Sequence, residues 1–67
     1  MIFLNGQHSD LNAGESVAAA LVRLHLAPDA SGVAVAVDGD VVPRSTWETF
    51  ALSDGARVEV LTAMQGG

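Results

Sequence analysis

The end of the chain carries the group with the clearest chemical potential, because the sequence finishes in Met64, Gln65, Gly66 and Gly67. Terminal glycines have no side chains and adopt backbone conformations closed to other residues, so they could pass down a narrow channel and present an α-carboxylate to another protein. Frayed ends and residues left by cloning also give such endings. The preceding fold must decide between these interpretations.

The remaining reactive side chains form no recognisable catalytic or metal-binding motif. Cysteine is absent, which excludes disulfides, thiolate nucleophiles and thiol ligands. His8 and His25 are too far apart in sequence for a known metal motif. Asp38, Asp40 and Asp54 flank turns, where aspartate is favoured for its hydrogen bonds to the backbone. We therefore expect no catalytic residues, no metal and no cofactor bound by this chain.

Charge and length narrow the class of protein and its partners. The 67 residues carry a net charge of −5, which disfavours nucleic acid as a partner, and all three basic residues are arginine. Without lysine the chain cannot form a Schiff base or supply a P-loop lysine. No apolar run is long enough to span a membrane and no signal peptide begins the chain, so we expect a cytoplasmic protein. The length allows one domain, a monomer when free.

The N-terminal third predicts two strands and the main helix. Residues 1–5 favour a strand with Phe3 on the face opposite its apolar neighbours, and residues 7–13 favour a weaker second strand. One apolar stripe at helical spacing predicts a helix over residues 17–26; it consists of Val17, Ala20, Leu21 and Leu24. Ser16 is placed to cap this helix, and Pro28 to stop it.

The rest of the chain predicts a hairpin, a short turn and a last strand. Valine and alanine alternate over residues 33–37, Asp38-Gly39 is a tight-turn pair, and the return strand ends at Pro43. Ser45 and Glu48 have capping-box spacing, which predicts a helical turn that packs Trp47 or Phe50 on the core. Residues 57–62 predict a strand with Val58 and Val60 on one face and Leu61 on the other.

This order of elements predicts an α+β fold. One mixed sheet of about five strands would have its apolar face covered by the main helix. The first and last strands would be central neighbours, so residues 1–62 would form the domain and residues 63–67 a flexible C-terminal tail.

The order resembles the β-grasp fold of ubiquitin-like proteins, and the residues resemble one branch of it, the ThiS family of sulfur carriers of thiamine thiazole synthesis. The similarity spans the whole chain and is most specific in VAVAVDGDVVPRSTWETFALSDGARVEVLTAMQGG. Val42-Pro43-Arg44 followed by Trp47 is its most discriminating part. Asp38 stands where the family often has asparagine, and Ala56 where it often has an acidic residue.

The resemblance implies a mechanism. A ThiF-like adenylyltransferase would use ATP to adenylate the carboxylate of Gly67, and a sulfur donor would displace AMP to leave a thiocarboxylate. Thiazole synthase, a ThiG-like enzyme, would receive the sulfur, so this chain would be a carrier and no enzyme. Gly66, Gln65 and Met64 would thread into the partner sites.

Partner recognition would fall on the sheet face away from the helix, where Phe3 and Leu61 project, beside the tail. Two related functions remain open: the small subunit of molybdopterin synthase, which shares the fold and the Gly-Gly ending, and a ubiquitin-like modifier joined to target lysines. The motif around Pro43 and Trp47 favours the thiamine carrier.

Overall fold

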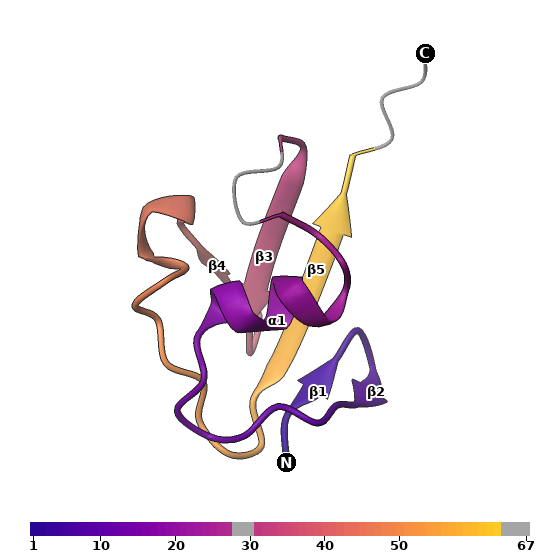
Figure 1. Ribbon diagram of the computed structural model, residues 1–67, viewed down its shortest axis with the longest axis vertical. Helices are drawn as coiled ribbons and strands as arrows, with labels where there is room; N and C mark the ends of the chain where they lie inside the picture. The colour runs from indigo at the N-terminus through magenta and orange to yellow at the C-terminus, as the bar shows by residue number, and fades with distance from the viewer. Residues whose placement is uncertain (28–30, 64–67) are drawn as a thin grey trace.

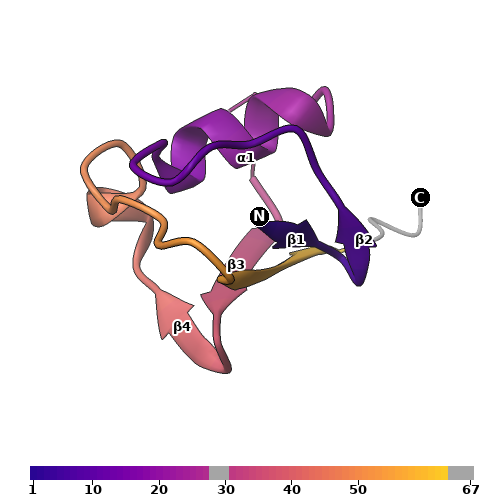
Figure 2. The same cartoon turned by 90° about the horizontal axis from the view of Figure 1, so that it is seen from below.

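In the described part of the chain, one face of a five-stranded sheet is crossed by the α-helix α1 (Figures 1 and 2). The computed structural model describes residues 1–27 and 31–63. Its elements are β1 (Phe3–Leu4), β2 (Gln7–His8), α1 (Val17–Arg23), β3 (Val33–Val37), β4 (Asp40–Val42), the 3-10 helix η1 (Arg44–Thr46) and β5 (Arg57–Thr62). This confirms the α+β prediction. None of the helices in the described ranges is long and apolar enough to cross a membrane.

The last strand lies in the middle of the sheet. The strand order is β2-β1-β5-β3-β4. β5 runs parallel to β1 and antiparallel to β3, and the two outer pairs, β1 with β2 and β3 with β4, are antiparallel hairpins. The sheet is therefore mixed, with the first and last strands as neighbours, as predicted.

The core lies between α1 and the sheet face that α1 covers. Alternation along the strands sends every second side chain toward the helix. The buried strand residues are Leu4, Val35, Val37, Val42, Val58 and Val60, and the helix contributes Val17, Ala20 and Leu21. Ile2, directly before β1, is fully buried, whereas Phe3 between Ile2 and Leu4 is only half-buried. The predicted facing of the first and last strands is confirmed.

Both hairpins close through the same kind of two-residue turn. Asn5-Gly6 joins β1 to β2, with φ angles of 51° and 80°, and Asp38-Gly39 joins β3 to β4, with φ angles of 51° and 88°. Positive φ at both positions is the type I′ geometry, whose twist matches that of the flanking strands. Asparagine and aspartate tolerate the left-handed region at the first position, and glycine occupies the second without strain.

The side chains of these two turns bind β5 from opposite sides. Asn5 Oδ1 accepts a hydrogen bond from the Val60 N–H at 2.8 Å. Asp38 Oδ1 accepts one from the Arg57 N–H at 3.0 Å, and the Asp38 N–H donates to the Arg57 carbonyl at 2.9 Å. Asn5 and Asp38 thus bond β5 beyond the last paired residues of β1 and β3, respectively.

The N-terminus of α1 is capped as predicted, since Ser16 Oγ accepts a hydrogen bond from the Ala19 N–H at 3.2 Å. The C-terminus differs from the prediction, because the helix ends at Arg23 instead of residue 26. The physical reason is that His25 adopts the left-handed conformation, with φ = 60°.

This conformation completes a Schellman motif. The Leu26 N–H bonds the Leu21 carbonyl and the His25 N–H bonds the Val22 carbonyl, both at 3.0 Å, which satisfies two carbonyls that the helix leaves open. The helix therefore stops before Pro28, which lies outside the described residues.

The second strand is shorter than predicted and ends at His8. Ser9 turns the chain inward, because both its N–H and its hydroxyl donate to the Ile2 carbonyl, at 3.0 and 2.7 Å. Leu11 is buried, with 3% of its surface exposed, yet it lies in a loop and reaches the core without strand pairing.

The segment after β4 forms a helical turn, but not through the predicted capping box. η1 begins after Pro43, no side chain caps it, and Ser45 lies inside it. Trp47 is buried and its Nε1–H donates to the Val42 carbonyl at 2.8 Å, while Phe50 stays 38% exposed. The Arg44 guanidinium lies 4.5 Å from the centroid of the Trp47 ring. Of the two aromatic residues considered, tryptophan fills the core.

Candidate functional site

The residues predicted to form the tail follow directly on the central strand. β5 ends at Thr62, and the N–H of the next residue, Ala63, donates to the Gly32 carbonyl at 2.6 Å. Pairing with the β3 side therefore continues through the first residue that the sequence assigned to the tail. Met64, Gln65, Gly66 and Gly67 lie outside the described residues, so their predicted roles remain predictions.

Phe3 and Leu61 lie on the sheet face away from α1, which is called the open face below. The Phe3 ring meets the His8 ring edge-on, with centroids 4.9 Å apart and an interplanar angle of 73°. Leu61 is 68% exposed and lies in register with Ala34 on β3. Both residues line one shallow groove that follows β1 and β5.

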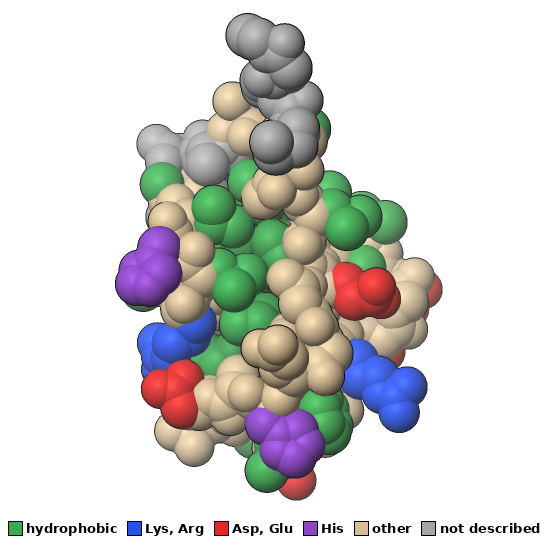
Figure 3. All heavy atoms as spheres, turned by 90° about the vertical axis from the view of Figure 1, so that its right-hand side faces the viewer, with side chains coloured by type: hydrophobic (Ala, Val, Ile, Leu, Met, Phe, Trp, Pro, Cys, Tyr) green, Lys and Arg blue, Asp and Glu red, His purple; other side chains and the backbone are tan. Residues whose placement is uncertain are grey.

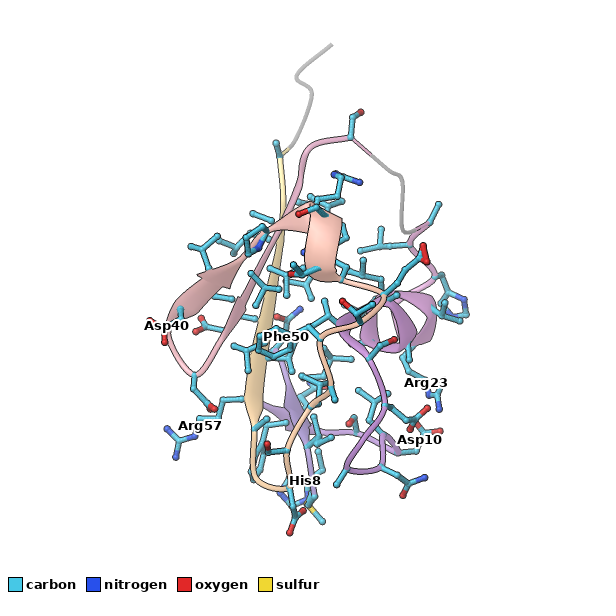
Figure 4. The ribbon with its side chains drawn as sticks, turned by 90° about the vertical axis from the view of Figure 1, so that its left-hand side faces the viewer. His8, Asp10, Arg23, Asp40, Phe50 and Arg57 are labelled. Atoms are coloured by element: carbon cyan, nitrogen blue, oxygen red, sulfur yellow. The ribbon has the colours of Figure 1, made fainter. Side chains whose placement is uncertain are left out.

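The centre of this groove is polar. Arg57 and Glu59 project from β5 on the same face as Leu61, and Phe3 is in register with Arg57. Figure 4 shows Arg57 pointing to the side of the sheet opposite α1. The lining residues are Phe3, Asn5, Gly6, Arg57, Val58, Glu59 and Leu61. The two predicted contact residues are thus separated by a basic and an acidic side chain and do not touch as one apolar patch.

A second hollow lies on the opposite side of Asn5, between the β1–β2 hairpin and the end of α1. Its lining is mostly polar and consists of Leu4, Asn5, Gln7, His8, Ser9, Asp10, Arg23 and Leu24. Sequence reasoning did not single out Asn5, although an Asn-Gly pair between two strands indicates a type I′ turn. That Asn5 reaches Val60 was not visible in the sequence.

One cluster of charged side chains links Asp10, Glu15 and Arg23. Arg23 Nε bonds Asp10 Oδ1 at 2.7 Å and its Nη2 is 3.4 Å from Glu15 Oε1; Figure 4 shows Arg23 and Asp10 side by side below the helix. The hydrogen bond and the charge of Arg23 lower the pKa of Asp10, and the same contacts with Asp10 raise the pKa of Arg23. This cluster ties the loop after β2 to the helix.

Within residues 1–27 and 31–63 no three histidine or acidic side chains are grouped to hold a metal ion. The described part of the chain also contains no buried polar side-chain atom without a hydrogen-bond partner. What the arrangement provides is a packed body whose central strand leads directly into the C-terminal residues.

Comparison with known proteins identifies the family. The model of the ThiS family matches residues 2–67. The crystal structure of the thiamine biosynthesis protein ThiS from Geobacter metallireducens is 31% identical, with a TM-score of 0.73, and the alignment covers 98% of this chain and 97% of that chain. The NMR solution structure of a thiamine biosynthesis protein from Geobacter metallireducens is 32% identical, with a TM-score of 0.72 and coverages of 98% and 86%. A search of curated proteins gives no match.

The family match extends through both terminal glycines, and the sheet order and the two structural relatives agree on one fold. The resemblance noted in the sequence is therefore confirmed: this chain belongs to the ThiS family.

Proposed function

We propose that this protein is the sulfur carrier of thiazole synthesis and that the α-carboxylate of Gly67 is the group that carries the sulfur. Members of the ThiS family are non-catalytic sulfur carriers. The observation that supports the proposal is the family match over residues 2–67, which includes the Gly66-Gly67 ending.

The proposed chemistry activates a carboxylate that is a poor electrophile. A ThiF-type enzyme joins the Gly67 carboxylate to the α-phosphate of ATP, releasing pyrophosphate and leaving a mixed anhydride with AMP. A sulfur nucleophile from a donor then attacks the acyl carbon, and AMP leaves with the electrons of the broken C–O bond. Attack by hydrosulfide gives the thiocarboxylate directly, whereas attack by a persulfide gives an acyl disulfide, and a thiol must then cleave its S–S bond and form a new disulfide with the donor sulfur. By either route the chain ends in a thiocarboxylate, an anionic nucleophile for thiazole synthase.

The body of the protein contributes placement. β5 is held from both sides, and its inward side chains Val58 and Val60 are buried, so the strand that precedes the tail is fixed. Four residues follow Ala63 and span at most about 14 Å when extended. The acceptor pocket of a partner must lie within this distance, and glycine at positions 66 and 67 lets the end enter a narrow channel.

Docking of the partners would use the open face beside the tail. Leu61 is exposed at the end of β5 and Phe3 lies at the other end of the same groove, so both can contribute apolar contact. Arg57 and Glu59 between them supply opposite charges that can fix the register of a partner. The net charge of −5 favours encounter with a basic surface.

Mass spectrometry tests the proposal. Incubated with the ThiF-type enzyme, ATP and a sulfur source, the protein should gain the mass expected when sulfur replaces one carboxylate oxygen, and fragmentation should place the change in the C-terminal peptide. A variant lacking Gly67, and a variant with valine at positions 66 and 67, serve as controls and should remain unloaded. Normal loading of the valine variant would refute the role assigned to the two glycines.

A pull-down separates this function from its nearest relative. Recovery of thiazole synthase with the loaded protein supports the thiamine assignment. Recovery of the large subunit of molybdopterin synthase instead would assign the protein to molybdopterin synthesis, and conjugation to lysines of other proteins would make it a modifier.

A further inference from the structure

The two edges of β5 are paired to different extents. β3 pairs with β5 over five residues, from Val58 to Thr62, whereas β1 pairs only with Arg57 and Val58. The Asn5-Gly6 turn then directs the chain away from β5 into β2 (Figure 1). The second half of β5 thus has no strand beside it on the β1 side within the described residues.

The backbone groups on this edge follow from the alternation of the strand. The Asn5 N–H bonds the Val58 carbonyl at 2.8 Å, and the Val60 N–H bonds Asn5 Oδ1 at 2.8 Å. The next two groups that face the same way are the Val60 carbonyl and the Thr62 N–H, because Ala63 directs its N–H to Gly32 on the β3 side. In residues 1–27 and 31–63 nothing bonds these two groups.

Mixed apolar and polar side chains line the surface beside this open edge on both faces of the sheet. The groove on the open face has Phe3 and Leu61 in its lining, and the hollow on the helix side has Leu4 and Leu24, with Asn5 common to both. Figure 3 looks onto this side of the molecule and shows hydrophobic side chains along its middle, with charged side chains toward its margins. An added strand could place its side chains against Phe3, Leu61 and the charged Arg57 and Glu59 on the open face, and against the mostly polar hollow on the helix side.

We propose that the enzyme that receives the tail adds an extended segment to this edge, with main-chain hydrogen bonds to the Val60 carbonyl and the Thr62 N–H. The inference rests on the proposed function, because the reacting carboxylate of Gly67 is then only four residues beyond Ala63. The enzyme surface must therefore come within about 14 Å of the end of β5. A surface that covers this edge without bonding it would leave two backbone groups desolvated and unpaired, which is unfavourable. An extended segment satisfies both groups.

Hydrogen exchange tests the proposal on the natural protein. Amide exchange of the wild-type protein is measured by NMR, free and in complex with the ThiF-type enzyme. The Thr62 amide should exchange at least about tenfold more slowly in the complex, as expected for a newly formed backbone hydrogen bond. The Val41 amide provides a matched reference. Val37 and Asp40 flank the two-residue turn as a hydrogen-bonded pair, so alternation directs the N–H of the next residue, Val41, to the outer edge of β4. Its exchange should be unchanged.

A proline variant tests the same hydrogen bond through affinity. Thr62→Pro removes the N–H that faces the open edge and leaves the amides that pair with β3 in place. The dissociation constant for the ThiF-type enzyme should rise about threefold to tenfold, the effect of one lost hydrogen bond. The control Val41→Pro removes an outward amide at the opposite edge of the sheet, and its dissociation constant should stay within about twofold of wild type.

The outcomes distinguish this inference from the proposed function. Sulfur loading of the wild-type protein, measured in parallel, decides the proposed function. If the wild-type protein is loaded with sulfur but its Thr62 amide is not protected in the complex, the edge interaction is refuted and the proposed function stands. Weak binding of Thr62→Pro would not rescue the edge interaction, because altered folding of that variant would explain it. Failure to load overturns both proposals, and loading with a protected Thr62 amide supports both.

Discussion

The two edges of β5 are paired to different extents, although the same type of turn closes the hairpin on each side. On the β3 side the pairing covers five residues, and Asp38 adds two hydrogen bonds at Arg57. On the β1 side it covers two residues, and the single side chain of Asn5 takes over at Val60. A strand held along one side stays in place when its other side is left partly open. The difference leaves the Val60 carbonyl and the Thr62 N–H open on the β1 side of a strand that is paired along its β3 side.

The apolar core spans both sides of β5, although the backbone pairing on the two sides is unequal. β1 contributes Leu4 to the core beneath α1, next to Ile2 just before the strand, and β3 contributes Val35 and Val37. The asymmetry therefore concerns hydrogen bonds at the edge and leaves the apolar core complete. The following predictions test this comparison.

The largest effect is expected in the core on the β3 side. Val35 is 1% exposed and in register with Val60, so Val35→Ala leaves a cavity against the central strand and should lower the free energy of unfolding by about 2–3 kcal/mol. Val41→Ala makes the same chemical change on β4 at a side chain that is 77% exposed, and it should cost less than about 0.5 kcal/mol. Urea denaturation measures both variants. Equal costs would show that the β3 side is not part of the core that holds β5.

An intermediate effect is expected from the two turn side chains, and it should differ between the two sides. Asn5→Ala removes the acceptor of the part-buried Val60 N–H and places alanine in a left-handed conformation, which should cost about 1–2 kcal/mol. Asp38→Ala brings the same backbone strain, but its bond to the Arg57 N–H is exposed and water can replace it, so the cost should be nearer about 1 kcal/mol.

The matched controls Asn5→Asp and Asp38→Asn keep both an acceptor oxygen and a residue that tolerates positive φ, so they should stay close to wild type. Thermal unfolding gives the stabilities, and hydrogen exchange at Val60 shows whether the loss is local. If Asp38→Ala were clearly the more damaging of the two alanine variants, the part-buried Asn5–Val60 bond would not stabilise the fold more than the exposed Asp38–Arg57 bond.

The smallest effect concerns the ion pair that ties the loop after β2 to α1. The pKa of Asp10 is lowered by Arg23, so its folded value lies below the ordinary value of 3.8. Its contribution to stability is therefore complete above the unfolded pKa and is lost as the pH falls below 3.8 through the lower folded pKa. Both side chains are exposed to solvent, which screens the pair and keeps the effect small.

Urea denaturation between neutral and acidic pH measures this contribution. The Asp10→Asn variant should lose less stability than wild type over that acidic range, because it has no carboxylate to protonate at this position. Identical pH profiles for the two proteins would show that the Arg23 contact does not stabilise the fold.

Repetition along the chain determined the main elements of this protein. The apolar stripe from Val17 to Leu24 and the alternation around Val58 and Val60 are local patterns, and each follows from the geometry of one helix or one strand. Asp38-Gly39 likewise specified its turn through residues that tolerate positive φ. The family was also readable, because its discriminating residues lie in one continuous stretch.

The tertiary structure alone decided the contacts between distant segments. Asn5 binds Val60 across 55 positions of sequence, a contact that exists only because β1 and β5 become neighbours in the sheet. The end of α1 depends on the left-handed His25, and periodicity carries no signal for a single residue of that kind. Sequence patterns report which face of an element is apolar, whereas the order of the strands decides which backbone groups are paired and which remain open at an edge.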